Sequence, residues 1–253
     1  MIEVKNIEKS FGENKVLKGV SALFESGKTN LIIGQSGSGK TVLLKSLLGI
    51  HAPDTGTISF DGRIYSDLTP DEKRELRTEI GMVFQGSALF DSMTVAENVG
   101  FPLKMFTENS KSDNQDRVDF VLKRVNLIDA HHKLPSEISG GMQKRVAIAR
   151  AIVNNPKYLF CDEPNSGLDP NTATLIDNLI KEITEEYNIT TVINTHDMNS
   201  VMEIGEKILF LKNGVKAWEG TKKEIFKTDN EAIVEFVYSS NLFKKVREAF
   251  LKS

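Results

Sequence analysis

Gly34-Gln-Ser-Gly-Ser-Gly-Lys40-Thr41 is the stretch that decides the fold of this chain. Its glycines allow backbone N–H groups to turn toward phosphate oxygens, and the helix expected after it adds a positive N-terminal end. The Lys40 ammonium can reach β- and γ-phosphates, and the Thr41 hydroxyl can bind Mg²⁺. A chance glycine-rich turn is disfavoured, because an apolar strand (29–33) precedes the stretch and a helical pattern (42–48) follows it. The predicted phosphate-binding residues are Gly34, Gln35, Ser36, Gly37, Ser38, Gly39, Lys40 and Thr41.

A second strand-like segment, Tyr158–Asp162, ends in two adjacent carboxylates, those of Asp162 and Glu163. Ligands of open α/β sheets bind beyond the carboxyl ends of the strands, which is where these two side chains would emerge. Two acids beside a triphosphate require a cation to offset their repulsion. We therefore expect Asp162 to hold the Mg²⁺ shell and Glu163 to position or deprotonate the attacking water. In isolation, acids at an exposed strand end would carry no such meaning.

Two other polar side chains follow apolar, strand-like segments. His196 comes just after segment 190–194, and a neutral imidazole there could contact the γ-phosphate and the attacking water. Gln85 directly follows segment 80–84, where its amide could bind Mg²⁺ or water without adding charge. A lone histidine is more often structural, and from pattern alone Gln85 fits a polar surface loop equally well.

The second decisive stretch, Ile138-Ser139-Gly140-Gly141-Met142-Gln143, begins with a serine and two glycines and continues as an amphipathic helix. A Ser139 N-cap, with N–H groups exposed by Gly140 and Gly141, would form a second anion site. A chain with two such elements can use both in a twofold homodimer, in which each ATP contacts 34–41 of one protomer and 139–141 of the other. An ordinary capped helix start is the alternative interpretation.

The overall composition argues against several classes of protein. The chain has 253 residues and a net charge of −3 with acidic and basic residues intermixed, so no nucleic-acid-binding stripe is expected. Its longest apolar stretches have the length of strands, well below the roughly 20 residues that span a bilayer. The single cysteine, Cys161, cannot form an internal disulfide and fits a reducing compartment. We expect a cytoplasmic chain that could serve a membrane only as a peripheral subunit.

Taken together, these residues resemble the nucleotide-binding subunit of ATP-binding cassette (ABC) transporters over roughly residues 1–225. The resemblance implies a Mg²⁺-dependent ATPase of α/β class: a P-loop core with a mixed sheet flanked by helices and an N-terminal antiparallel β part. It implies core segments 1–85 and 156–225, an inserted α-helical subdomain (86–155) and a C-terminal helical extension (226–253). The cofactors would be ATP and Mg²⁺, the latter held by Thr41, Gln85 and Asp162.

The resemblance also assigns two further nucleotide-site residues and shows some departures. Phe11 falls where the family places an aromatic ring that stacks on adenine, although an aromatic there could equally belong to the core. Asp169 ends the Ser166-Gly-Leu-Asp169 loop of the family's pattern. Ile138 and Met142 stand where the signature usually has leucine and glutamine, and Gly167 replaces the usual alanine, which would loosen that loop.

A subfamily is indicated by segments 84–103 and 135–142, which look like the ATPases of Mla/MCE-type phospholipid transporters. Those work at the inner membrane with a separate permease, whose coupling helix docks in a groove flanked by 84–103, and with an MCE lipid-binding protein. ATPases of solute importers and of lipoprotein-release systems share much of this pattern and remain alternatives. A nucleic-acid-linked ABC ATPase is disfavoured because those carry long coiled-coil insertions or two cassettes, and a regulator without turnover because Glu163 and His196 are present.

Overall fold

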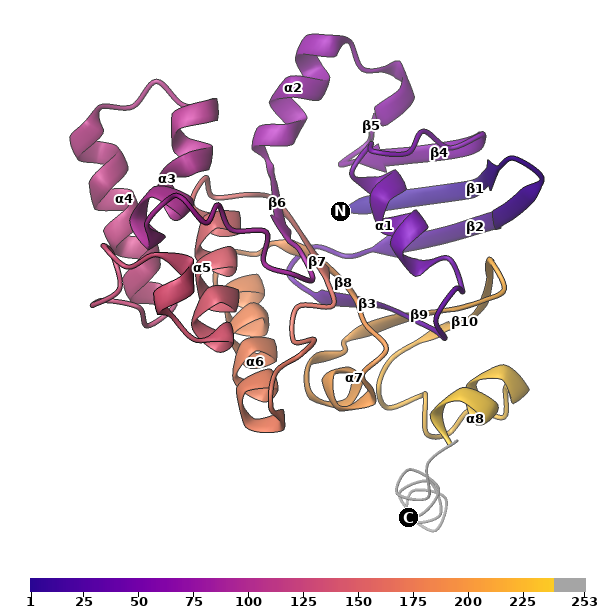
Figure 1. The fold of residues 1–253 in the computed structure, drawn as a ribbon. Coiled ribbons are helices and arrows are strands. Elements are labelled where there is room, and N and C mark those ends of the chain that lie inside the picture. The colour runs from indigo at the N-terminus through magenta and orange to yellow at the C-terminus, as the bar shows by residue number, and fades with distance from the viewer. Residues whose placement is uncertain (239–253) are drawn as a thin grey trace. The chain divides into compact units, whose positions relative to one another are not determined.

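The computed structural model describes residues 1–238, which form two compact units. The first unit contains residues 1–68 and the chain from residue 192 onward, and the second contains residues 69–191. The elements of both units are labelled in Figure 1, and each unit is described here by itself.

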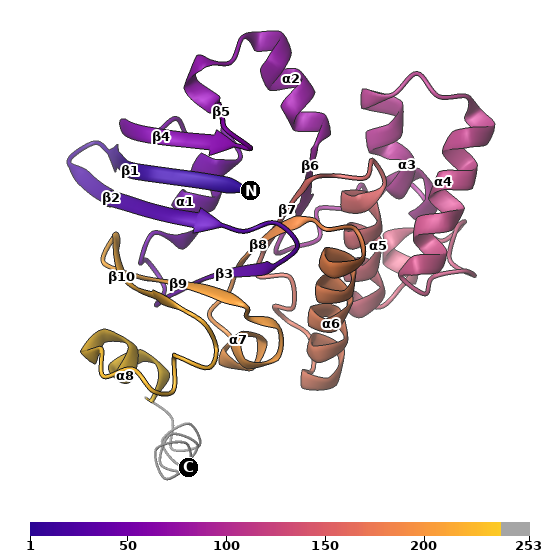
Figure 2. The same ribbon diagram turned by 180° about the vertical axis from the view of Figure 1, so that it is seen from behind.

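The first unit begins with an antiparallel sheet, seen from behind in Figure 2. Its strand order is β2-β1-β4-β5. Apolar residues at alternating positions of β1, among them Ile2 and Val4, are buried, as expected of a sheet with one face against the core. The strands are β1 (Ile2–Phe11), β2 (Asn14–Phe24), β4 (Thr55–Phe60) and β5 (Arg63–Ile64), followed by a short 3₁₀ turn (Tyr65–Asp67).

The rest of the first unit carries a second group of strands and three helices. Strand β3 pairs in parallel with β9, and β9 pairs antiparallel with β10. Every residue of β3 is buried, including the apolar run 31–33, as expected of a strand covered on both faces. The elements are β3 (Thr29–Ile33), β9 (Lys207–Lys212), β10 (Val215–Gly220), α1 (Lys40–Leu47), α7 (Met198–Ile204) and α8 (Glu231–Val237). Strand β8 (Thr190–Asn194) carries the chain from the second unit into the first.

The second unit combines two parallel strands with five helices. Strand β6 pairs with β7 in a register that sets Val83 opposite Cys161. Helix α5 contributes a run of buried apolar residues, 146–149, and contacts α3, α4, α6 and β6. The elements are α2 (Pro70–Thr78), β6 (Ile80–Val83), α3 (Val95–Phe106), α4 (Lys111–Arg124), a 3₁₀ turn (Pro135–Glu137), α5 (Gly140–Ile152), β7 (Tyr158–Asp162) and α6 (Pro170–Glu186).

Most of the elements expected from periodicity are present, including the parallel pairing. Three helices and strands were not predicted: the two-residue β5, the seven-residue helix α7, and β10, whose residues are exposed or half-buried and do not alternate. The C-terminal helical face is confirmed for Ile233, Phe236 and Val237, whereas the part with Phe243, Val246 and Phe250 lies outside the described residues. Over residues 1–238, no helix combines the length and the apolar character needed to cross a bilayer. The division into core, helical subdomain and extension stays a prediction.

Candidate functional site

In the first unit, the predicted phosphate loop connects the end of β3 to the start of α1. Gly34 is required there by close approach, since a Cβ atom at this position would collide with the main-chain oxygen of Leu211 and would lie 2.7 Å from Ser38 Oγ. Gly39 occupies the N-cap of α1 with a left-handed φ of 104°, and no side chain caps the helix. The first N–H groups of α1 are therefore not taken by a side-chain cap, as an anion site requires.

The side chains of Lys40 and Ser38 suit the binding of a phosphate group by this loop. Lys40 is only 6% exposed, and its Nζ donates to the carbonyl oxygens of Gly34 (2.9 Å) and Gln35 (3.1 Å). The ammonium is thus held over the loop by the loop's own backbone. Ser38 Oγ is buried and has no hydrogen-bond partner within the described part of the chain. A buried hydroxyl of this kind gains a partner when a phosphate oxygen enters the loop.

Strand β8 brings a further polar group to the same loop. Asn194, the last residue of β8, is fully buried and donates from Nδ2 to Thr41 Oγ1 at 3.2 Å. The chain beyond β8 stays beside β3, where Thr195 N donates to the main-chain oxygen of Ile32 at 3.1 Å. His196 follows as an exposed residue just before Asp197, which caps α7. Asn194 was not assigned a role from sequence, although its position at the end of a buried strand is the signal that singled out Gln85.

Phe11 lies at the hairpin between β1 and β2. Its ring is 46% exposed, so it is not a core residue. It meets the ring of His51 edge-on at 5.2 Å and the ammonium of Lys9 at 5.5 Å. An exposed aromatic face suits base stacking, and that role remains a prediction.

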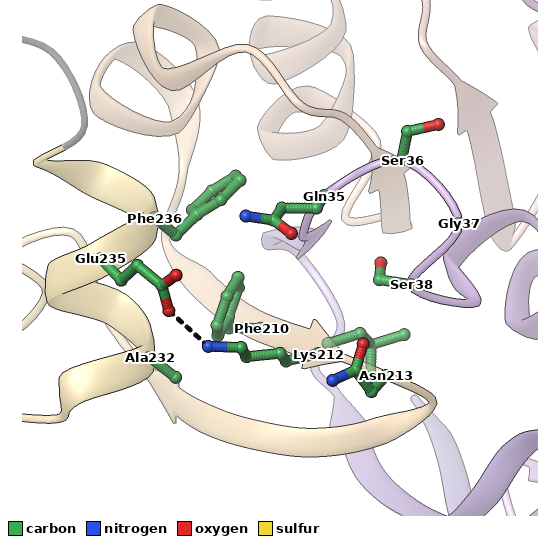
Figure 3. A pocket seen from close by; sticks show the side chains of 11 residues that line it. Gln35, Ser36, Gly37, Ser38, Phe210, Lys212, Asn213, Ala232, Glu235 and Phe236 are labelled. Carbon is green, nitrogen blue, oxygen red and sulfur yellow. Dashed lines mark hydrogen bonds and ion pairs between the residues drawn. The ribbon is translucent and has the colours of Figure 1, made fainter.

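A small cavity lies beside the phosphate loop, between Gln35–Ser38, the end of β9 and helix α8 (Figure 3). Its volume is about 60 Å³, which suits ordered water rather than a nucleotide. Helix α8 is fastened there by the rings of Phe236 and Phe210, 5.0 Å apart, and by an ion pair of 2.5 Å between Lys212 and Glu235. The described part of the C-terminal extension therefore packs next to the loop predicted to bind phosphate.

In the second unit, the strand register explains how Gln85 reaches Glu163. Val83 pairs with Cys161, so the residues two positions further along both strands fall side by side. Gln85 Nε2 donates to Glu163 Oε2 at 2.9 Å and, more weakly, to Ser166 Oγ at 3.4 Å. Glu163 has a left-handed φ of 46°, which turns its side chain at the strand end. Asp162 is half-buried at the end of β7.

The signature residues form the start of α5. Ser139 Oγ accepts from Met142 N at 3.3 Å and caps the helix, while Gly140 is exposed. A Cβ atom on Gly141 would lie 2.7 Å from Thr172 Cγ2, so a larger residue here would require the Thr172 side chain to shift. The Ser139 N-cap is therefore present as predicted, whereas a second anion site at this helix start stays a prediction.

Asp169 has a structural task that the sequence did not reveal. Its Oδ1 accepts from Asn171 N and Thr172 N, both at 3.1 Å, and so caps α6. Hydrogen bonds from the hydroxyl and backbone N–H of Thr172 lower the pKa of this carboxyl. A role of Asp169 at the nucleotide stays a prediction.

Two buried basic side chains of α5 also belong to the neighbourhood of Gln85. Lys144 donates to the main-chain oxygen of Gln85, and Arg150 to those of Ser87 and Ala88. Sequence reasoning missed both, because a basic residue on an amphipathic helix is ordinarily assigned to the solvent face. No pattern in the sequence signals their burial.

The side chains predicted to bind Mg²⁺ carry oxygen atoms suited to this ion. Thr41, Gln85 and Asp162 offer hydroxyl, amide and carboxylate oxygens, the ligand types that Mg²⁺ prefers beside phosphate oxygens and water. Among residues 1–238, no cluster of three or more histidine, cysteine, aspartate or glutamate side chains could hold an ion by itself.

A larger groove opens in the second unit, with a volume of about 430 Å³. It is mainly apolar, and three of its phenylalanines are exposed: Phe84 (42%), Phe90 (41%) and Phe106 (43%). The rings of Phe90 and Phe101 are 4.8 Å apart. The lining residues are Ile80, Gly81, Met82, Phe84, Ala88, Phe90, Phe101, Pro102, Phe106, Arg150, Ala151 and Asn154.

Comparison with known proteins places this site in a family. The sequence profile described as "ABC transporter" matches residues 17–166. A probable ribonucleotide transport ATP-binding protein, mkl, of Mycobacterium leprae is 36% identical over 93% of this chain and 68% of its own length. The methionine import ATP-binding protein MetN of Clostridium acetobutylicum is 38% identical over 95% of this chain and 75% of its own. The chloroplastic protein TRIGALACTOSYLDIACYLGLYCEROL 3 of Arabidopsis thaliana is 36% identical over 95% of this chain and 74% of its own length.

Solved structures agree with the fold and the chemistry. The dimeric structure of MJ0796, a bacterial ABC transporter cassette, is 36% identical and superimposes with a TM-score of 0.79 over 87% of this chain and 98% of that one. The same cassette in a post-hydrolysis state bound to ADP and Pi gives a TM-score of 0.78 over the same shares. The expected α/β cassette fold, a mixed sheet flanked by helices, is confirmed. The chain belongs to the ABC transporter family, as an ATP-binding subunit that couples ATP hydrolysis to transport.

Proposed function

We propose that this chain is the ATPase of a transporter that moves phospholipid between membranes, acting as a homodimer on the cytoplasmic face of the inner membrane. The observation that carries the proposal is the apolar groove around Phe84, Phe90 and Phe106. Exposed phenylalanines around a concavity of this kind suit the apolar face of a partner helix. The partner would be an integral-membrane permease, with an MCE lipid-binding protein beyond it.

A lipid cargo has further support in the name of one relative, and the phospholipid class in the resemblance of segment 84–103. The Arabidopsis relative bears the name of a diacylglycerol glycolipid. Segment 84–103, which resembles the Mla/MCE type, supplies five of the residues that line the groove. A solute importer is the second candidate, because two relatives are named for methionine import and ribonucleotide transport.

For hydrolysis, we propose that residues 34–41 and Ser139–Gly141 bind ATP, that Phe11 stacks on adenine, and that Asp169 completes the site. Thr41, Gln85 and Asp162 would hold Mg²⁺, which neutralises phosphate charge when bound. Glu163 would take the proton of the attacking water, while Gln85 orients Glu163 and His196 contacts the γ-phosphate. Support comes from the 2.9 Å hydrogen bond between Gln85 and Glu163 and from the buried position of Lys40.

The role of Glu163 is tested by Glu163→Gln, which keeps the size of the side chain and removes its basicity. Turnover should fall at least ~100-fold, as expected when a general base is lost. ATP should still bind, so size-exclusion chromatography with ATP should show a trapped dimer. Normal hydrolysis by this variant would contradict the proposed base.

The cargo is tested by affinity purification of the tagged chain from detergent-solubilised native membranes, followed by mass spectrometry of proteins and lipids. A permease recovered with an MCE-domain protein and phospholipid would support the proposal. A permease with a solute-binding protein would favour the importer and leave the ATPase roles intact. Recovery of no membrane protein would contradict the proposed partner.

A further inference from the structure

Two basic side chains of α5 are buried without an ion pair in the described part of the chain. Lys144 is 5% exposed and Arg150 is 9% exposed. Burial lowers the pKa of both groups, because removal from water disfavours their charged forms. A buried charge is costly unless hydrogen bonds replace its hydration. Their hydrogen-bond acceptors therefore indicate why α5 carries them.

All three acceptors lie in the four-residue segment 85–88. Lys144 Nζ donates to the main-chain oxygen of Gln85. Arg150 donates from Nη1 to the oxygen of Ala88 and from Nη2 to that of Ser87, each at 2.7 Å. The fork of one guanidinium thus holds two consecutive carbonyl groups, a geometry that an ammonium cannot reproduce.

Segment 85–88 has a backbone conformation that needs such support. Ser87 and Ala88 have left-handed φ values of 62° and 48°. Consecutive non-glycine residues rarely adopt this conformation, and it persists only where surrounding structure enforces it. Within the segment, the backbone bond from Ala88 to Gly86 is a short-range turn that does not tie it to α5. Arg150 and Lys144 supply that tie.

The segment begins with the residue whose amide contacts the proposed base. Gln85 is exposed, and its Nε2 reaches Glu163 at 2.9 Å. A shift of about 1 Å in the main chain at Gln85 would break this hydrogen bond, because hydrogen bonds weaken steeply beyond their narrow range of distance and angle. We propose that Lys144 and Arg150 are positioning residues for ATP hydrolysis, which hold segment 85–88 so that the Gln85 amide stays on Glu163. This inference rests on the proposed roles of Gln85 and Glu163.

Arg150 also links this segment to the groove. Both Arg150 and Ala88, the residue whose carbonyl it holds, line the groove of about 430 Å³. A helix bound there would touch the guanidinium and its acceptor directly. The positioning of Gln85 is consequently open to adjustment by the groove's occupant.

The test is steady-state ATPase kinetics of the purified chain with Lys144→Met and Arg150→Met. We expect kcat to fall at least tenfold while KM for ATP changes less than twofold, because residues 34–41 are untouched. Arg150→Lys, which keeps the charge but loses the fork, should recover part of the rate. Arg117→Met is the matched control: Arg117 is half-buried and donates to the carbonyl groups of Ile152 and Val153 at the end of the same helix, away from segment 85–88. It should leave kcat unchanged.

A double variant separates positioning from general destabilisation. If Lys144 acts through Gln85, adding Lys144→Met to Gln85→Ala should reduce kcat no further, whereas independent effects would multiply. Multiplied losses, an equal loss of kcat in Arg117→Met, or an unchanged kcat in both methionine variants would overturn the proposal. Should Arg150→Met not fold, Arg150→Lys and Lys144→Gln provide the same comparison. Failure of the proposed function is distinguishable from failure of this inference. Normal hydrolysis by Glu163→Gln would contradict the proposed base itself. Recovery of no permease would contradict the proposed partner but would not affect these ATPase measurements.

Discussion

At the scale of single residues, Gly34 shows how closely the phosphate loop is packed. A methyl group at this position would meet the oxygen of Leu211 and Ser38 Oγ, so Gly34→Ala must displace the loop or β9. We expect ATP affinity to fall at least ~10-fold, equivalent to about 1.4 kcal/mol. Titration with a fluorescent ATP analogue would measure it.

Gly62→Ala is the control for this change. Gly62 also has a left-handed φ, of 83°, but open space surrounds its Cβ position. Both substitutions place a side chain at a positive φ, which is 151° at Gly34 and costs on the order of 1–3 kcal/mol, and only Gly34→Ala adds a collision at the loop. Equal ATP affinities of the two variants would contradict the close-approach argument.

The buried thiol of Cys161 predicts how the stability of the fold depends on pH. The thiol is fully buried in β7, and burial raises its pKa, helped by the nearby Asp177 and Asp162 carboxylates. In the unfolded chain it would lose its proton near an ordinary value of roughly 8.5. A raised pKa in the folded state contributes stability that is present below pH ~8.5 and is lost as the pH rises above it.

The measurement is urea unfolding between pH 7.5 and 10. The free energy of unfolding should fall with a slope approaching ~1.4 kcal/mol per pH unit above pH ~8.5, and Cys161→Ala should reduce this slope. Iodoacetamide at pH 8 should label the thiol only after unfolding. Rapid labelling of the native chain would show that β7 is accessible and would refute the argument.

At the scale of elements, α8 gives a test of how the C-terminal extension attaches. Phe236 packs on the buried ring of Phe210, and Ile233 is fully buried. Phe236→Ala removes a half-buried ring and should lower the free energy of unfolding by ~2–3 kcal/mol, somewhat less than for a fully buried phenylalanine. Thermal unfolding followed by circular dichroism would measure this.

The ion pair on the same helix provides the comparison. Lys212 and Glu235 lie 2.5 Å apart, but the Glu235 side chain is 66% exposed, and exposed pairs contribute little. Glu235→Gln should therefore leave the melting temperature almost unchanged. If Glu235→Gln were as destabilising as Phe236→Ala, charge rather than packing would hold α8 in place.

The elements also show what could be predicted from sequence. Strands β3, β6 and β7 each contain a short apolar run, and α1 follows a glycine-rich loop, so residue pattern and motif both predicted these elements. Helix α7 was missed because it is short, although its cap, Asp197, was a readable signal. The hydrogen bond of Gln85 to Glu163 required the register of β6 on β7, and the burial of Lys144 and Arg150 required the path of segment 85–88. Neither register nor loop path is encoded in local periodicity.

At the scale of the whole molecule, the proposed dimer is the remaining question. The phosphate loop lies in the first unit and the Ser139–Gly141 helix start in the second, and each is predicted to bind phosphate. A twofold homodimer would let each ATP use one element from each protomer. In that arrangement, a defect in either element of one chain should be complemented by the other chain.

Mixing two inactive variants tests this directly. In Lys40→Ala combined with Ser139→Ala chains, a heterodimer has one site with both defects and one site with neither. With Glu163→Gln also present in both chains to prevent turnover, each heterodimer should trap one ATP, whereas either parent alone should trap none. Random pairing makes about half of the dimers heterodimers, so roughly a quarter of the sites should fill. The occupied fraction is measured as radiolabelled ATP that stays with the protein on a desalting column. Occupancy of roughly a quarter of the sites would support the shared site. Retention no higher than in the separate parents would show that each ATP is bound within a single chain, because only a site shared between protomers can be rebuilt by mixing.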